Sequence, residues 1–162
     1  MKSGIVKQIE QNVFQRFGIG AYVHTRNIEW CYYIRSESFR PDVVATLNVP
    51  RVKVRTNAEA LENVLLYLLG NAAIHTETGK ITLEFKKRSA HSGQFIVTDT
   101  GIGIPEEKRA NLFKPFAEVQ DLTKGDSLGH PTCSLIAYKL NGTLRLDEEY
   151  KKGTRFILEL HS

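Results

Sequence analysis

The 162-residue chain is poor in cysteine and has no long apolar run, and both absences exclude classes of protein. Its two cysteines, Cys31 and Cys133, lack the spacing of metal-ligand pairs and do not indicate a disulfide framework. The longest apolar stretch, Val64 to Leu69, is interrupted by Tyr67 and is far shorter than a membrane span. The start of the chain, Met1-Lys2 and a mixed polar segment, does not resemble a signal peptide. These absences predict a cytoplasmic domain without membrane contact. The prediction holds even for a domain that belongs to a larger, membrane-anchored protein.

The chain also lacks a strong excess of charge of one sign. Its formal net charge is +4. Hydrophobic residues make up 41% of the chain and charged residues 25%, which is ordinary for a soluble globular protein. The small positive excess suits an anionic ligand such as a nucleotide, and it equally suits an ordinary surface. The basic clusters Lys86-Lys87-Arg88 and Lys151-Lys152 are short and lack interleaved aromatic residues, so we expect solvated turns and no nucleic-acid binding. The length predicts one domain over residues 1–162.

Apolar periodicity and turn residues predict an α/β domain without internal repeats. Helices are expected over residues 3–17, 57–75, 105–113 and 131–140. Strands are expected over residues 28–34, 42–48, 51–55, 80–87, 93–99, 143–148 and 154–160. The polar stretch 117–129, which contains two glycines, is expected to be mobile.

The most informative run is Asp99-Thr100-Gly101-Ile102-Gly103-Ile104-Pro105, which follows an expected strand. Asp99 shares a strand face with Phe95 and Val97, so its carboxylate is expected to be buried and to need donors from the protein or from a ligand amine. Gly101 and Gly103 would leave room for a ligand and permit positive φ. The alternative is a glycine-rich turn in which Asp99 caps the next helix. The run alone leaves both interpretations open.

Two helix features are candidates for the rest of a site. Asn63, Tyr67, Asn71 and His75 form one row at a spacing of four, and the amide oxygen of Asn71 is a suitable Mg²⁺ ligand. The segment Gly129-His130-Pro131 begins a helix, whose exposed N–H groups attract phosphate. The alternatives are a polar helix edge and an ordinary helix start.

The order of these features resembles the N, G1, F and G2 boxes of sensor histidine kinases, in the GHKL ATPase superfamily. The matching segments are Asn71, Asp99 to Pro105, Leu112-Phe113-Lys114-Pro115-Phe116, Leu128-Gly129 and Gly153-Thr154-Arg155-Phe156. The resemblance covers about residues 52–160 closely. It implies the catalytic, ATP-binding domain of these kinases: a two-layer α/β sandwich of the Bergerat type, with helices on one face of a mixed sheet and a flexible ATP lid at about 117–128.

The resemblance also implies a role for each matching residue. Asp99 would accept a hydrogen bond from the adenine amino group, and Asn71 would serve catalysis as the ligand of Mg²⁺. Gly101 and Gly103 would shape the floor around the base, with Thr154 on the adenine side. Gly129 would approach the phosphates. The remaining expected ATP contacts are Ile104, Phe116 and Leu128.

Sensor kinases phosphorylate a histidine on a separate helical dimerisation domain, and a response regulator receives the phosphoryl group next. The histidines of this chain, at positions 24, 75, 91, 130 and 161, lack the acceptor-box context of that domain. We therefore expect one domain of a larger two-component protein, which binds ATP but does not phosphorylate itself in isolation.

The chain departs from the family pattern where phosphate and metal would bind. Tyr67 stands where a polar Asn or Glu is usual, and Ile74 stands where a Lys is frequent. Ser127 replaces a glycine, His130 replaces an apolar residue, and His75 replaces an aromatic one. Each lost charge-assisted contact would cost about 1.5–3 kcal/mol. One hypothesis is that His75 or His130 compensates by donating to phosphate; the alternative is that both are surface histidines.

These departures keep two other functions open. A degenerate GHKL module with weak or no nucleotide binding would act as a scaffold or regulatory domain. A stand-alone ATPase or anti-sigma-type serine kinase is less favoured, because Tyr67 replaces the carboxylate that would activate water or a hydroxyl.

Overall fold

The computed structural model describes residues 19–21, 30–34, 43–48, 56–114 and 129–161, with side chains in the last two ranges except at position 58. The expected helix 3–17, the strand 51–55 and the lid 117–128 lie outside the described residues. Within the described part, no helix is both long and apolar enough to span a membrane.

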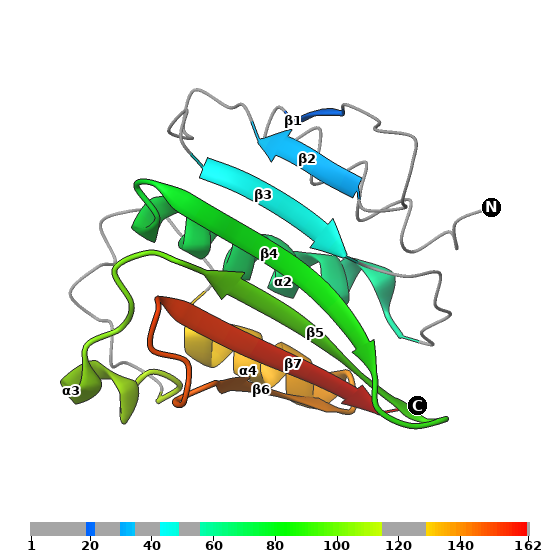
Figure 1. Cartoon of the computed structure of the whole chain (residues 1–162). Coiled ribbons are helices and arrows are strands. Elements are labelled where there is room, and N and C mark those ends of the chain that lie inside the picture. Colours follow the sequence, from blue (N-terminus) through cyan, green and yellow to red (C-terminus); the bar gives the residue numbers. More distant parts are fainter. Residues whose placement is uncertain (1–18, 22–29, 35–42, 49–55, 115–128, 162) are drawn as a thin grey trace.

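A seven-stranded mixed sheet forms one layer of the domain (Figure 1). Its order is β1-β2-β3-β4-β5-β7-β6, and β3 and β4 are the one parallel pair among these strands. The strands are β1 (Ile19–Ala21), β2 (Trp30–Ile34), β3 (Val43–Asn48), β4 (Gly79–Lys87), β5 (Ser92–Asp99), β6 (Gly142–Leu146) and β7 (Thr154–His161). The mixed sheet predicted from the sequence is confirmed.

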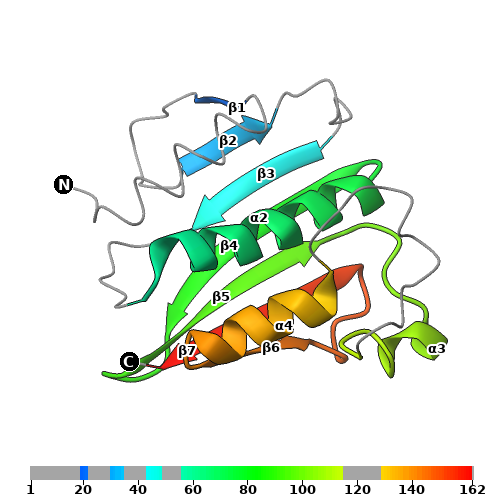
Figure 2. The same cartoon turned by 180° about the vertical axis from the view of Figure 1, so that it is seen from behind.

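Two helices, α2 (Ala58–His75) and α4 (His130–Lys139), lie side by side on one face of the sheet (Figure 2). The short helix α3 (Glu106–Arg109) follows β5 at the end of the sheet where β7 begins (Figure 1). The side chain of Asn57 caps α2 by accepting from the N–H of Ala60 at 3.0 Å. The predicted arrangement of helices on one face is therefore confirmed.

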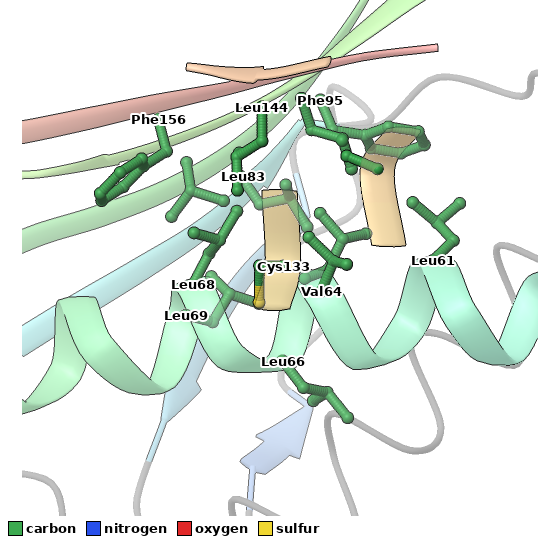
Figure 3. Close-up of a cluster of buried hydrophobic side chains, with 14 of the residues drawn as sticks. Leu61, Val64, Leu66, Leu68, Leu69, Leu83, Phe95, Cys133, Leu144 and Phe156 are labelled. Carbon is green, nitrogen blue, oxygen red and sulfur yellow. The ribbon is translucent and has the colours of Figure 1, made fainter. Parts of the chain in front are cut away.

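The core lies between α2, α4 and the inner face of the sheet (Figure 3). The predicted apolar row of α2 is fully or almost fully buried, and its members are Leu61, Val64, Leu65, Leu68 and Ala72. Strand residues such as Leu83, Phe95 and Phe156 pack against them. Burial also raises the pKa of the Cys133 thiol to about 12, so this side chain behaves as a small apolar core residue.

The observed boundaries differ from the predicted ones in two places. β1 was not expected, because three residues carry too little alternation to predict a strand. The helix expected over 105–113 ends at Arg109, and the chain continues to Lys114 in tight turns with bonds such as Leu112 N–H to the Arg109 carbonyl. The remaining described elements lie within two residues of their predicted ends.

Truncation of α2 at its buried face should destabilise the domain strongly. Leu68 is 1% exposed, so Leu68→Ala should lower the free energy of unfolding by about 2–5 kcal/mol. Ile74 on the same helix is 70% exposed, and Ile74→Ala should change it by less than about 0.5 kcal/mol. Urea denaturation of both variants measures the difference. Equal losses would contradict the orientation of α2.

Candidate functional site

Asp99 ends β5 and is almost fully buried, with 4% of its surface exposed. Its Oδ1 accepts hydrogen bonds from the backbone N–H groups of Gly101, at 2.9 Å, and Thr154, at 3.3 Å. Within the described residues, Oδ2 accepts none. Among the described residues, donors therefore reach one oxygen of the carboxylate, and the other oxygen can accept a further hydrogen bond.

The alternative in which Asp99 caps the following helix is wrong. Helix α3 has Pro105 at its N-cap position and no side-chain cap. The two bonds of Asp99 instead join the turn after β5 to the start of β7. Its carboxylate therefore organises the turn and the strand beside it.

Burial raises the pKa of Asp99 above its ordinary value of 3.8, because removal from water penalises the charged form. The backbone donors at Gly101 and Thr154 oppose this shift, and the nearby His75 adds a smaller lowering effect. A buried carboxylate with a raised pKa, one oxygen of which has no donor among the described residues, is a candidate for a binding site.

The glycines of this turn are required by close approaches of the protein's own backbone. A Cβ at Gly101 would collide with the carbonyl of His75 at the end of α2, so the space predicted for a ligand at this residue is filled by the helix. A Cβ at Gly153 would collide with the carbonyl of Asp99. Gly103 has φ +74°, a conformation that glycine permits, and a Cβ there would lie 3.2 Å from the Gly153 carbonyl.

Further hydrogen bonds hold the turn from both sides. The backbone N–H of Lys80 donates to the hydroxyl of Thr100 at 2.9 Å, and the N–H of Ile102 donates to the His75 carbonyl at 3.2 Å. Arg109 reaches back from α3, and its Nε donates to the Ile104 carbonyl at 2.9 Å. The sequence interpretation missed Arg109; its spacing of five from Ile104 carries no motif signal.

Asn71 lies on α2 with its side chain against His130, the first residue of α4. Nδ2 of Asn71 is 3.3 Å from Nε2 of His130, and the Tyr67 hydroxyl is 3.2 Å from Nδ1 of the same ring. The ring is 5% exposed and stacks on Phe156, with centroids 5.1 Å apart and planes at 29°. Phe113 contacts its edge.

These contacts revise the expectations for the two histidines. His130 is buried, so the prediction of a surface histidine is wrong for it. Both of its ring nitrogens face protein partners, which leaves the hypothesis of a phosphate contact without structural support. His75 is exposed at the end of α2, as the same alternative predicted.

Comparison with known proteins gives a match over most of this fold. Residues 56–162, more than half of the chain, match the model of the histidine kinase-, DNA gyrase B- and HSP90-like ATPases. The chain belongs to this ATPase family.

Relatives of the chain within the family include sensor kinases. The chain is 37% identical over 108 residues to the hybrid signal transduction protein dokA of Dictyostelium discoideum. The matched region is 60% of this chain and 6% of dokA. It is 32% identical over 117 residues to the autoinducer 2 sensor kinase/phosphatase LuxQ of Vibrio vulnificus, covering 67% and 14%. The chain therefore spans a small part of the curated relatives that it matches.

Solved structures share the fold. The catalytic domain of histidine kinase ThkA superposes with a TM-score of 0.70 at 22% identity, covering 96% of this chain and 93% of that domain. The mycobacterial sensor histidine kinase MprB gives a TM-score of 0.67 at 20% identity, covering 97% and 91%. The Bergerat-type fold predicted from the sequence is thus confirmed. The family match and the sensor-kinase relatives make the chain an ATP-binding domain of the histidine-kinase type.

The described residues fit the ligands of this family. Oδ2 of Asp99 suits the amino group of adenine. Among the described residues no group of three or more His, Cys, Asp or Glu side chains could hold a metal, so a metal here would rely on Asn71 and on phosphate oxygens. Mg²⁺ accepts such a site, because it keeps several waters and needs few protein ligands when phosphates are present.

The other predicted site residues are placed as follows. Gly129 is the N-cap of α4, with Pro131 in the first turn, and Thr154 is 7% exposed beside Asp99. Ile104 is half-buried against the core. Phe116 and Leu128 lie outside the described residues, so their expected ATP contacts stay predictions.

Asp99→Asn should stabilise the domain relative to wild type, increasingly so as pH rises. The pKa of Asp99 is raised in the folded protein, so above about 3.8 the unfolded chain loses this proton first and wild-type stability falls. The Asn variant keeps the oxygen that accepts from Gly101 and Thr154 but does not ionise. Urea unfolding of both proteins at a series of pH values from the ordinary pKa of 3.8 upward measures the difference. A difference that is flat, or that shrinks with rising pH, would contradict this account.

Proposed function

We propose that this chain is the catalytic domain of a two-component sensor histidine kinase and that it transfers the γ-phosphoryl group of Mg-ATP to a histidine on a separate domain. The observation that carries the proposal is the buried Asp99 carboxylate, with one oxygen held by backbone donors and the other without a donor in the described residues. The family match and the sensor-kinase relatives support it.

Each side of the nucleotide has a matching group on the domain. Oδ2 of Asp99 accepts from the adenine amino group, and the rigid turn at Gly101 and Gly103 carries the base. The first turn of α4, from Gly129, directs backbone N–H groups at the phosphates. Asn71 would hold Mg²⁺, which when bound supplies neutralisation of the phosphate charge.

The domain contributes binding and orientation, and the acceptor domain contributes the nucleophile. In the transfer, a nitrogen of the acceptor imidazole forms the P–N bond as the bond between the γ-phosphorus and the bridging oxygen breaks, and ADP leaves. The acceptor imidazole releases its other N–H proton to solvent. Holding the γ-phosphoryl group in line with that nitrogen is the main effect required of this chain. Its partners are then the acceptor domain and, after it, a response regulator, in the cytoplasm.

A degenerate regulatory module is the second candidate. Ile74, in place of the frequent lysine, is 70% exposed and offers no charge to phosphate. If the domain has lost nucleotide binding, Tyr67→Asn combined with Ile74→Lys should create or strengthen it. Titration calorimetry with Mg-ATP decides between the candidates: no heat from the wild-type domain at millimolar nucleotide would favour the degenerate module.

Asp99 should set the preference for adenine over a base with an oxygen at the same position. Inosine triphosphate places a carbonyl where ATP has its amino group, so the wild-type domain should bind ATP about tenfold to a hundredfold more tightly. Asp99→Asn offers a donor at the position of Oδ2 and should lose or reverse this preference. Calorimetry with both nucleotides measures it, with Glu84→Gln on β4 as the control. Equal ATP affinities of wild type and Asp99→Asn would count against the adenine contact.

The parent protein should form phosphohistidine that depends on this domain. Incubated with γ-labelled ATP, it should take up label that is stable to alkali and lost in acid, as expected for a P–N bond. Asn71→Ala in the parent should abolish the label, and the isolated chain should take up none. Acid-stable label on the parent would contradict a histidine acceptor.

A further inference from the structure

Two of the positions at which the chain departs from the sensor-kinase pattern contact each other. Tyr67 and His130 are 63 residues apart in sequence, yet the Tyr67 hydroxyl and Nδ1 of His130 are 3.2 Å apart. Their rings meet edge to face, with centroids 5.2 Å apart. The other ring nitrogen of His130 faces Asn71, the residue expected to hold the metal. The two departures and Asn71 therefore form one chain of side-chain contacts, which we call the relay Tyr67–His130–Asn71.

The relay favours one arrangement of protons. With Nδ2 of Asn71 facing the ring, Asn71 donates and Nε2 of His130 accepts. In the neutral ring the proton is then on Nδ1, and that N–H donates to the Tyr67 oxygen. The amide of Asn71 consequently uses its nitrogen toward His130 and directs its oxygen away from the ring.

The His130 ring is well placed to impose this orientation. It is 5% exposed and stacked on Phe156, and the rings of Tyr67 and Phe113 contact it edge-on. A ring enclosed on these sides cannot turn without disturbing the core. An apolar side chain at position 130 would offer no acceptor to the amide of Asn71, which could then present either end.

We propose that Tyr67 and His130 are positioning residues that hold Asn71 with its Oδ1 toward Mg²⁺. The proposal rests on the proposed function for the identity of the ligand. It assigns a use to two side chains that otherwise count as losses from the metal-binding motif: the Tyr67 hydroxyl accepts from the Nδ1–H of His130, and Nε2 of His130 accepts from the amide of Asn71. Neither residue touches the metal itself.

The first test needs no nucleotide. Nitrogen-15 NMR of the histidine rings in the ligand-free wild-type protein should show His130 as the Nδ1–H tautomer, with Nε2 unprotonated. Tyr67→Phe should shift this ring toward a mixture of tautomers. The Nε2–H tautomer in the wild-type protein would overturn the proposal, since the amide oxygen of Asn71 would then face the ring.

The second test measures how much Mg²⁺ tightens nucleotide binding. We take the ratio of the ATP dissociation constant in EDTA to that in excess Mg²⁺, by calorimetry. Tyr67→Phe and His130→Leu should each lower this ratio about threefold to tenfold, the effect of one hydrogen bond, and Tyr67→Phe should leave the constant in EDTA unchanged. Adding Tyr67→Phe to His130→Leu should lower the ratio no further, because both act through the same relay.

Matched controls separate this effect from general damage. Tyr138→Phe removes a hydroxyl from an exposed position of α4, and His91→Gln changes a histidine in the turn before β5. Both should leave the ratio at the wild-type value. If His130→Leu does not fold, Tyr67→Phe carries the test, because it keeps the ring that packs against His130.

The outcomes separate this proposal from the proposed function. Asn71→Ala should remove the Mg²⁺ effect entirely. If it does so while Tyr67→Phe and His130→Leu keep the wild-type ratio, the positioning role is wrong and the proposed function stands. If the wild-type protein binds no nucleotide, the proposed function fails together with the metal part of this proposal, and the tautomer of His130 decides whether the relay orients Asn71.

Discussion

Burial of the apolar row of α2 against the sheet is the constraint on which the site depends. Leu61, Val64, Leu65 and Leu68 are each at most 1% exposed, so the helix cannot rotate about its axis without exposing several large side chains. This fixed rotation carries Tyr67 and Asn71 to the side of the helix that meets α4. It also brings the last carbonyl of α2, at His75, into contact with the turn after β5.

The turn after β5 holds the buried carboxylate of Asp99. The solvation free energy that this group loses on burial is linked to its proposed role in binding a ligand. Asp99 loses solvation, which raises its pKa, and recovers part of the loss through the N–H groups of Gly101 and Thr154. Because Oδ2 has no donor among the described residues, a ligand donor there gains more than it would at a solvated oxygen. The same burial penalises a ligand that presents an acceptor. The proposed selectivity for adenine and the predicted fall in stability with rising pH would thus share one cause.

Sequence reasoning succeeded where the signal is local and failed where it depends on tertiary contact. The period of α2, the burial of Asp99 and the start of α4 each follow from a few consecutive residues, and the fold followed from the order of the motifs. The steric reason for Gly101 is the approach of His75, which only the packing of α2 defines. The contact of Tyr67 with His130 joins residues on two helices, and neither residue type predicts the other. β1 was missed because it is short.

The relay changes how the departures from the family pattern should be counted. Counted position by position, Tyr67 replaces a polar residue of the family pattern and His130 replaces an apolar one, so each counts as a loss. In the folded domain the two side chains contact each other, and His130 also contacts Asn71. His130 therefore gives Tyr67 a hydrogen-bonding partner. Ile74 differs, because its exposed side chain offers no substitute for a cation. Under our proposal the metal side of the site would have a replacement built from the protein. Phosphate binding would depend instead on the helix start at Gly129, whose N–H groups carry no net charge.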